Sequence, residues 1–274
     1  MVMNYIHGQD GKDRSVQSAA FNWNAQFNWK SLRVGVLQKD FDLAPYSPPA
    51  PPKPVDQMTA EEKQQYDDRV GRGQAAYNSR AADRAFDVAA LEKLKSMGVK
   101  MTPVELPAEF TPLLVAAMEQ ILEAEAAAAS DELTRTGRDK LLTRQTPQDW
   151  PNRFRTSRFI PAVEYVQANR VRMLLIEAMA KLFENLDLIV APTNGAHVTV
   201  TNLSGHPAVI LPNGFRSADT PMPNTNNPNA GGGPGTPVSL TFLGSLYSDA
   251  KLLAFARAYQ DATTFHLKHP NVDA

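Results

Sequence analysis

Short apolar runs alternate with longer helical stretches along this chain, a pattern typical of an α/β protein. Residues 32–37 (LRVGVL) and 186–192 are apolar with little alternation, as expected for strands covered on both faces. Residues 208–211 and 238–243 predict two more strands, which we expect to be neighbours in the sheet because they are sequential. These runs predict a β-sheet flanked by helices.

Residues 100–106 (KMTPVEL) predict a further strand. Pro103 favours an edge position for it, because proline cannot donate a hydrogen bond to a sheet ladder. Together with the strand at 32–37 and the helical sequence between them, this segment predicts a βαβ unit with a right-handed crossover.

The helical sequence between those strands begins with a recognisable cap. Thr59 and Glu62 have the spacing of a capping box, in which each side chain accepts a backbone hydrogen bond at the helix start. Gly71 and Gly73 predict that this helix is weakened or broken. A second helix is then predicted to end near residue 97, with Gly98 just past its end.

Three more helices are predicted towards the C-terminus. Residues 108–142 include an alanine-rich run of high helix propensity. Residues 158–185 predict a helix with one buried face. Residues 248–266 predict a last helix with Ser248 as its N-cap. The predicted buried face of the 158–185 helix consists of Val163, Val166, Val171, Leu174, Leu175, Ala178 and Leu182.

Two segments are too rich in turn-forming residues for regular structure. Six prolines in the segment 44–54 predict a stiff surface stretch of polyproline II type. The Gly/Pro/Asn-rich segment 216–237 predicts a long surface loop. We find no internal repeat, and the whole chain, 1–274, is interpreted as one incomplete domain.

Composition narrows the class of protein. The chain has 274 residues, 43% of them hydrophobic, a formal net charge of −1 and no cysteine. A near-neutral charge without a basic stripe disfavours nucleic-acid binding, and the lack of cysteine excludes disulfides, thiolate nucleophiles and cysteine-based zinc sites. No run has the ~20 apolar residues needed to cross a bilayer, and no signal peptide is evident, so we expect a cytoplasmic protein without membrane partners.

Candidate chemistry is sparse. Ser204, Gly205 and His206 place a serine near a histidine, but there is no nucleophile-elbow motif, and sequence proximity alone does not make a catalytic pair. The favoured interpretation is structural: Gly205 and Pro207 shape a tight turn while Asn202 and Ser204 hydrogen-bond to the backbone around it.

Two other motifs and one helix also have competing interpretations. His266 and His269 lack an evident third metal ligand, and the glycine-rich residues 231–235 lack the Lys-Ser/Thr ending of a phosphate-binding loop. Arg158 and Tyr165 lie in a polar helix, where they can either bind a carboxylate or amide or form an ordinary solvated face.

The strand motifs together resemble a known family. Residues 187–193 (DLIVAPT), 201–215 (TNLSGHPAVILPNGF) and 235–244 (GTPVSLTFLG) are similar to the C-terminal part of amidase-signature enzymes. The resemblance runs from about residue 4 to residue 270. It includes the further segments 7–13, 32–37, 91–98, 157–172 and 259–270.

The resemblance implies a mixed β-sheet flanked by helices and a chemistry of amide C–N bond hydrolysis without cofactor or metal. Members of the family use a nucleophilic serine, a bridging serine in a cis peptide and a lysine, and none of these can be assigned in this chain. The chain is therefore predicted to be inactive alone and to act on a small-molecule amide only when completed by an N-terminal half. The positions expected to face substrate are Arg158, Tyr165, Asn202, Ser204, Gly205, His206 and Pro207.

Two hypotheses remain. In one, the chain is the distal part of an amide hydrolase or amidotransferase. In the other, it is a catalytically inert remnant that serves as a binding or interaction module. In the second case, the lack of the half that supplies neighbouring strands would leave sheet edges and apolar faces uncovered, which predicts self-association.

Overall fold

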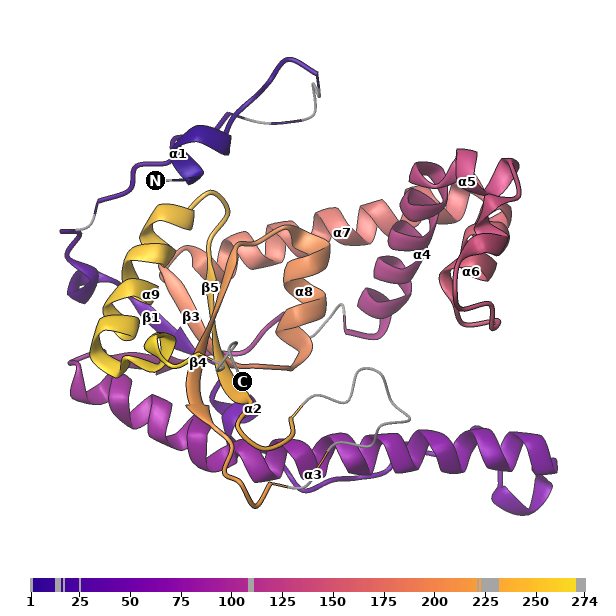
Figure 1. Cartoon of the computed structure of the whole chain (residues 1–274), viewed down its shortest axis with the longest axis horizontal. Coiled ribbons are helices and arrows are strands. Elements are labelled where there is room, and N and C mark those ends of the chain that lie inside the picture. The colour runs from indigo at the N-terminus through magenta and orange to yellow at the C-terminus, as the bar shows by residue number, and fades with distance from the viewer. Residues whose placement is uncertain are drawn as a thin grey trace.

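A five-stranded mixed sheet lies at the centre of the molecule, with helices on both faces (Figure 1). The computed structural model describes residues 2–12, 16, 18–24, 26–107, 111–220, 222 and 232–269. The strands lie in the order β2-β1-β3-β5-β4. They are β1 (Val34–Val36), β2 (Met101–Pro103), β3 (Leu188–Pro192), β4 (Ala208–Phe215) and β5 (Pro237–Gly244).

The parallel and antiparallel halves of the sheet meet at β3. Strand β1 is parallel to both β2 and β3, with Val34 opposite Met101 and Leu188. Strand β5 is antiparallel to β3 and β4. The predictions of a βαβ unit, of paired strands at 208–211 and 238–243, and of an edge strand containing Pro103 are confirmed.

Helices α3 (Ala60–Ser96) and α9 (Asp249–Thr263) cover one face of the sheet. Leu94 of α3 and Phe255 of α9 are fully buried there, together with Phe242 of β5. The Phe242 and Phe255 rings pack edge to face, with centroids 4.9 Å apart. Alternate residues of β3, Leu188 and Val190, point into this cluster.

Helices α4 (Thr111–Ala129), α7 (Ala162–Phe183) and α8 (Ala196–Ser204) belong to the other face. Ile189 of β3 packs there with Leu175 and Met179 of α7, and all three side chains are fully buried. Because both faces are covered, β3 is buried at every position, as its apolar run predicts. The remaining helices are short: α1 (Met3–Ile6), α2 (Gln38–Asp42), α5 (Asp131–Arg135) and α6 (Trp150–Thr156), with 3-10 turns η1 (Trp29–Ser31), η2 (Val55–Gln57), η3 (Arg138–Leu141), η4 (Ser157–Phe159) and η5 (Phe265–Leu267).

Helix α3 corrects one prediction and confirms another. The capping box of Thr59 and Glu62 is present, but the helix runs unbroken for 37 residues past both glycines. The proline-rich segment packs along it, and Tyr46 donates a 3.0 Å hydrogen bond to the Val70 carbonyl oxygen. A Cβ at Gly73 would lie 2.5 Å from the Tyr46 hydroxyl oxygen, so Gly73 gives the tyrosine room rather than ending the helix.

Helix α7 differs from its prediction in its start and in its buried face. It begins at Ala162, directly after Pro161, and not at residue 158. Leu175 is buried as expected, but Val163, Val166 and Leu174 are 60%, 55% and 49% exposed. The N-terminal part of α7 extends beyond the sheet and packs against α4 (Figure 1), so the sheet does not cover these positions.

Other boundaries also differ from the predictions. The helix predicted at 108–142 ends at Ala129, and Gly137 takes a left-handed conformation (φ 72°) before η3; residues 108–110 lie outside the described part. The turn predicted over residues 202–207 is confined to Gly205, because Asn202 and Ser204 belong to α8. Ser248 is the N-cap of α9, but its hydroxyl donates to the Ser245 carbonyl oxygen (2.7 Å) instead of capping the helix.

Candidate functional site

The carboxyl ends of the parallel strands β1 and β3 lie side by side and carry the candidate site. Helix α2 follows β1 and carries Asp40, while the turn after β3 leads through Gly195 to His197 in the first turn of α8. Helix α2 lies between the sheet and α3 (Figure 1). In α/β proteins ligands bind outside the carboxyl ends of such strands, where the loops converge.

Gly195 brings Asp40 and His197 close together. A Cβ at this position would lie 3.0 Å from His197 Nδ1 and 3.2 Å from Asp40 Oδ2. The backbone of Gly195 is extended (φ 168°), so any residue could adopt its conformation. The glycine is therefore required by the close approach of the two side chains and not by its backbone angle.

His197 is a buried histidine whose ring nitrogens lack hydrogen-bond partners. It is 1% exposed, and neither ring nitrogen has a partner with hydrogen-bond geometry. Burial lowers its pKa to about 4; the nearby backbone of Thr193 opposes this shift and the Arg80 guanidinium adds to it. At neutral pH the ring is uncharged, so it offers one donor and one acceptor nitrogen.

Asp40 adds an acceptor to the same place. Burial raises the pKa of its carboxyl, and the positive charge of Arg80 opposes that shift. Arg80 donates a 2.9 Å hydrogen bond to the Asp40 backbone oxygen, and Arg84 donates to the backbone oxygen of Phe41. Helix α3 thus places a guanidinium beside the carboxylate and fixes the short helix that carries it.

A second polar group lies where α3 crosses β4. Asn213 donates a 3.4 Å hydrogen bond to Asp87, while its own Oδ1 is buried without a partner. Burial raises the pKa of Asp87 to about 6, and the neighbouring Asp83 carboxylate adds to this shift while Asn213 opposes it. Arg80 also lowers the pKa of Asp87, so one guanidinium acts on both carboxyl groups.

The arrangement can bind and orient a polar group, but it lacks a nucleophile. A carboxylate and a neutral imidazole match the N–H and C=O groups of an amide. Within the described residues no serine or lysine side chain is hydrogen-bonded to Asp40 or His197, and no group of three His, Asp or Glu side chains is placed to hold a metal.

The structure places Ser204 and His206 at the C-terminal end of α8. They do interact: Ser204 Oγ is 2.8 Å from His206 Nδ1 and 2.7 Å from the Val200 carbonyl oxygen. Both side chains are buried, and the imidazole stacks on Phe183 with centroids 5.4 Å apart. Burial lowers the pKa of His206. A serine 3% exposed cannot reach a substrate carbonyl unless α8 moves, so this geometry favours the structural interpretation.

Gly205 forms the turn that follows α8, and Pro207 comes just before β4. Gly205 adopts a left-handed conformation (φ 78°) and its N–H caps α8 by donating to the Thr201 carbonyl oxygen (2.8 Å). The Pro207 carbonyl oxygen accepts a 2.9 Å hydrogen bond from Gly244. Asn202 is exposed. The segment thereby joins α8 to the antiparallel half of the sheet.

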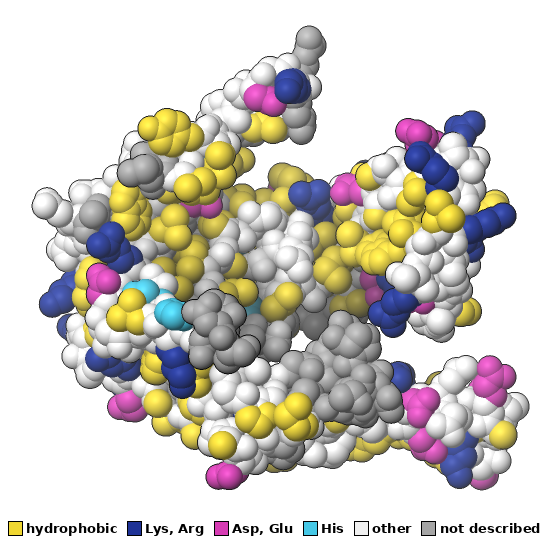
Figure 2. All heavy atoms as spheres, in the orientation of Figure 1, with side chains coloured by type: hydrophobic (Ala, Val, Ile, Leu, Met, Phe, Trp, Pro, Cys, Tyr) yellow, Lys and Arg dark blue, Asp and Glu magenta, His cyan; other side chains and the backbone are white. Residues whose placement is uncertain are grey.

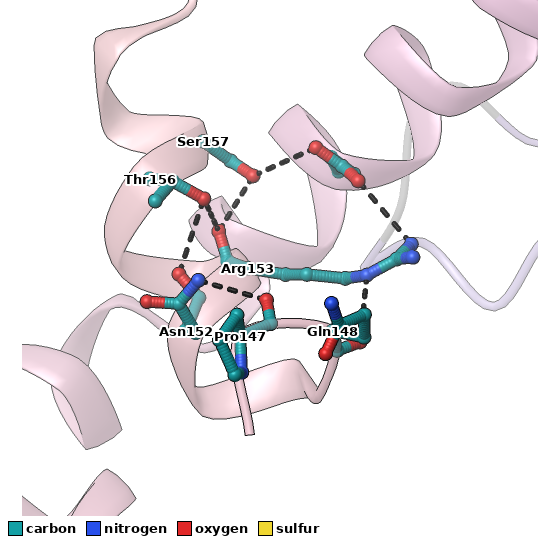
Figure 3. A network of polar contacts seen from close by, with 7 residues as sticks. Pro147, Gln148, Asn152, Arg153, Thr156 and Ser157 are labelled. Atoms are coloured by element: carbon teal, nitrogen blue, oxygen red, sulfur yellow. Dashed lines mark hydrogen bonds and ion pairs between the residues drawn. The ribbon is translucent and has the colours of Figure 1, made fainter. Parts of the chain in front are cut away.

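Arg158 and Tyr165 lie on the helical arm formed by α4 to α7, in a different set of contacts from Ser204 and His206. Arg158 is bound to Asp131, and the Tyr165 hydroxyl donates to Glu125 of α4 (3.1 Å). Figure 3 shows a network around Arg153 on the same arm: Arg153 donates to the Gln148 carbonyl oxygen (3.0 Å) and to Glu123 (3.2 Å). The Arg158 guanidinium and the Tyr165 hydroxyl, both predicted to face substrate, are thus already bound to carboxylates of the chain itself.

Sequence reasoning did not single out Asp40 and His197. Each follows a predicted buried strand within a few residues, and the two strands were expected in one sheet. Parallel strands place such residues at a common edge. The sequence does not show that β1 and β3 are parallel neighbours, and without that pairing Asp40 and His197 cannot be placed together.

Proteins of known family share both sequence and fold with this chain, although no protein-family model matches the sequence. The A subunit of glutamyl-tRNA(Gln) amidotransferase from Acinetobacter baumannii is 25% identical over 97% of this chain and 52% of its own length. Its counterpart from Acinetobacter baylyi is 33% identical over 37% of this chain and 21% of its own length. A bacterial aryl acylamidase of the amidase-signature family has the same fold over 97% of this chain and 51% of its own, with a TM-score of 0.64 at 16% identity.

The chain is similar in sequence to the amidotransferase A subunits and in fold to an amidase-signature enzyme. The peptide amidase of Stenotrophomonas maltophilia shares the fold as well, over 86% of this chain and 44% of its own, with a TM-score of 0.52 at 17% identity. The amidase-signature fold predicted from the strand motifs is confirmed. The chain spans about half the length of the proteins that it matches along 97% of its own length, 52% of the Acinetobacter baumannii protein and 51% of the aryl acylamidase.

Proposed function

We propose that this chain forms the C-terminal part of an amidase-signature enzyme that hydrolyses amide C–N bonds. In this proposal it supplies the sheet and one side of the substrate cleft, and a segment outside this chain supplies the two serines and the lysine. The observation that carries the proposal is the fold match over 97% of this chain to about half of an aryl acylamidase.

The candidate site supports a role in substrate binding. Asp40, His197 and Arg80 converge at the carboxyl ends of β1 and β3, where a carboxylate, a neutral imidazole and a guanidinium meet. Figure 2 shows an open gap between the arm formed by α3 and the arm formed by α4 to α6. A substrate that enters between the arms would find hydrogen-bonding groups at the sheet edge.

The positions that the sequence predicts to face substrate have indirect roles in this proposal. Arg158 and Tyr165 would face substrate only after leaving Asp131 and Glu125. The segment from Asn202 to Pro207 would act by holding α8, and with it His197, against the sheet. In this proposal the half-buried Asp40 would meet the substrate, and the fully buried His197 would lie behind it.

The test is complementation with the part of an amidase that this chain does not match. The N-terminal half of the bacterial aryl acylamidase is expressed separately and mixed with this chain, and release of 4-nitroaniline from 4-nitroacetanilide is followed. We expect hydrolysis only in the mixture, and none when the nucleophilic serine of the added half is replaced by alanine. Glutamine, tested in the same mixture, distinguishes an amidotransferase-type substrate from an aryl amide.

Hydrolysis by this chain alone would contradict the proposal and would turn attention to Ser204 and His206. If the two halves form a complex that hydrolyses none of the amides, the catalytic role fails and the alternative is favoured.

The alternative, an inert binding or self-associating module, has its own supporting observation. Large apolar side chains are exposed on the helical arm: Phe159 is 85% exposed, Val163 60% and Leu113 53%. Exposed apolar groups gathered on one arm are typical of interaction surfaces. Among the described helices, none is long and apolar enough to span a bilayer.

A further inference from the structure

A cavity of about 450 Å³ opens at the amino-terminal ends of the parallel strands, at the opposite edge of the sheet from Asp40 and His197. It is lined mainly by residues that precede β1, β2 and β3, which converge here because these three strands are parallel, together with Val34 of β1 and Thr102 of β2. None of them belongs to the proposed substrate site.

Three cationic side chains line this cavity: Lys30, Arg33 and Lys100. Arg33 forms an ion pair with Asp187 (3.1 Å), whose other oxygen is bound by Lys251 at 3.1 Å. Burial alone would raise the pKa of Asp187, but the hydrogen bonds from Arg33 and Lys251 hold it below its usual range. That carboxylate is therefore already engaged by two cations.

Lys30 and Lys100, unlike Arg33, have no carboxylate partner among the described residues. Neither forms an ion pair with a described carboxylate, and the Lys30 ammonium lies 5.6 Å from the centroid of the Trp29 ring. Both lysines line the same cavity, so an anion bound in it would be attracted by two ammonium groups. A dianion matches their combined charge.

Part of the remaining wall is apolar, and its largest side chain, Trp29, is fixed in place. The Trp29 indole packs edge to face against Phe255, with centroids 6.0 Å apart, so the ring is held by the core. Val99 and Leu186, each 9% exposed, continue the apolar lining. Thr102 and Asn185 add hydrogen-bonding groups beside it.

We infer that this cavity binds a small phosphate monoester that carries an aryl or other flat apolar group. The phosphate dianion would lie between Lys30 and Lys100, and the apolar group would pack on Trp29. A carboxylate carries a single negative charge and would neutralise only one of the two ammonium groups. A bare phosphate would make no use of the Trp29 indole and the other apolar side chains of the wall. The inference does not depend on amide hydrolysis.

Phenyl phosphate tests it directly, because inorganic phosphate and phenol each reproduce one half of the ligand. Titrations of the full chain are followed by calorimetry and by tryptophan fluorescence. We expect phenyl phosphate to bind at a single site at least ~10-fold more tightly than either half, with an affinity that falls as salt is added. The double variant Lys30→Gln/Lys100→Gln should weaken binding by at least ~10-fold, about 1.4 kcal/mol.

The matched control removes the same charge elsewhere. Lys140 and Lys181 also lack a described ion-pair partner and lie outside the cavity lining, so Lys140→Gln/Lys181→Gln should leave binding unchanged. Four results would overturn the inference: absence of binding, phenyl phosphate no tighter than phosphate, equal weakening by both double variants, or no effect of Lys30→Gln/Lys100→Gln.

Discussion

Arg216 binds Asp83 through two parallel hydrogen bonds and so ties the β4–β5 hairpin to helix α3, across 133 residues of sequence. Nε donates to Oδ1 at 2.9 Å, and Nη2 donates to Oδ2. The same guanidinium donates to Thr236 Oγ1 (2.9 Å) and to the Pro237 carbonyl oxygen (3.1 Å). One side chain thus holds both strands of the hairpin and the helix beneath them.

Arg216→Gln should lower the free energy of unfolding by ~2 kcal/mol, since it leaves Asp83 partly buried without its partner. The two side chains are only 15% and 17% exposed. Chemical denaturation measures the loss. Arg257→Gln is the matched control, because its pair with Asp261 is 58% and 65% exposed and should contribute less than ~0.5 kcal/mol. Equal effects of the two substitutions would contradict the role assigned to Arg216.

The two glycines of α3 should respond differently to alanine. A Cβ at Gly71 meets nothing within 4 Å, so Gly71→Ala should stabilise the protein by ~0.5–1 kcal/mol through helix propensity. At Gly73 the same gain is offset because the Tyr46 hydroxyl must move and lose its bond to Val70, at ~1 kcal/mol. Thermal unfolding of both variants checks the difference. Limited proteolysis of the proline-rich segment should accelerate only in Gly73→Ala.

His197 and Asp87 should affect the pH dependence of the free energy of unfolding in opposite directions. His197 has a pKa of about 4 when folded and an ordinary value of 6.5, so its contribution is full above pH 6.5 and is lost as pH falls towards 4. Asp87 has a folded pKa of about 6 and an ordinary value of 3.8, so its contribution is full below pH 3.8 and is lost as pH rises through 6. Each slope is at most ~1.4 kcal/mol per pH unit.

Single substitutions separate the two slopes. Between pH 6.5 and 4, His197→Gln should lose less stability on acidification than the unmodified protein, and Asp87→Asn should lose more. Denaturation curves at several pH values measure this. If both variants followed the unmodified protein, the assignment of these pKa shifts to the burial of His197 and Asp87 would be wrong.

Self-association should depend on the exposed apolar side chains of the helical arm. We expect the chain to form dimers or larger species in light scattering after size exclusion, and Phe159→Ser/Val163→Ser to shift them towards the monomer. Leu267→Ser is the control, since Leu267 is also 65% exposed but lies on η5. A monodisperse monomer that binds no hydrophobic dye would contradict the prediction.

The strands of the sheet could be predicted from the sequence because a strand buried on both faces has a local sequence pattern. Residues 32–37 and 186–192 are apolar without alternation, and their cores, β1 and β3, are buried on both faces. It was insufficient at Gly73, because the reason for that glycine is Tyr46, a residue 27 positions earlier on another segment. Helix propensity depends on the local sequence and gives no information about a contact with a distant residue.

The same limit applies to α7 and to the candidate site. The apolar spacing of Val163, Val166 and Leu174 does not reveal that the helix extends beyond its sheet. His197 and Asp40 are adjacent only because β1 and β3 are parallel, and neither belongs to a motif. Ser204 and His206, which do form a sequence pair, meet inside the fold as part of a helix end.

The position of β5 between β3 and β4 has a consequence for synthesis on the ribosome. A growing chain makes the edge strand β4 before the central strand β5 that joins it to β3. Until residues 237–244 have left the exit tunnel, β3 lacks its antiparallel partner and the hairpin cannot close. The sheet can therefore be completed only after residue 244 has been made, and a message cut short before that point would yield a nascent chain in which one side of β3 has no partner strand.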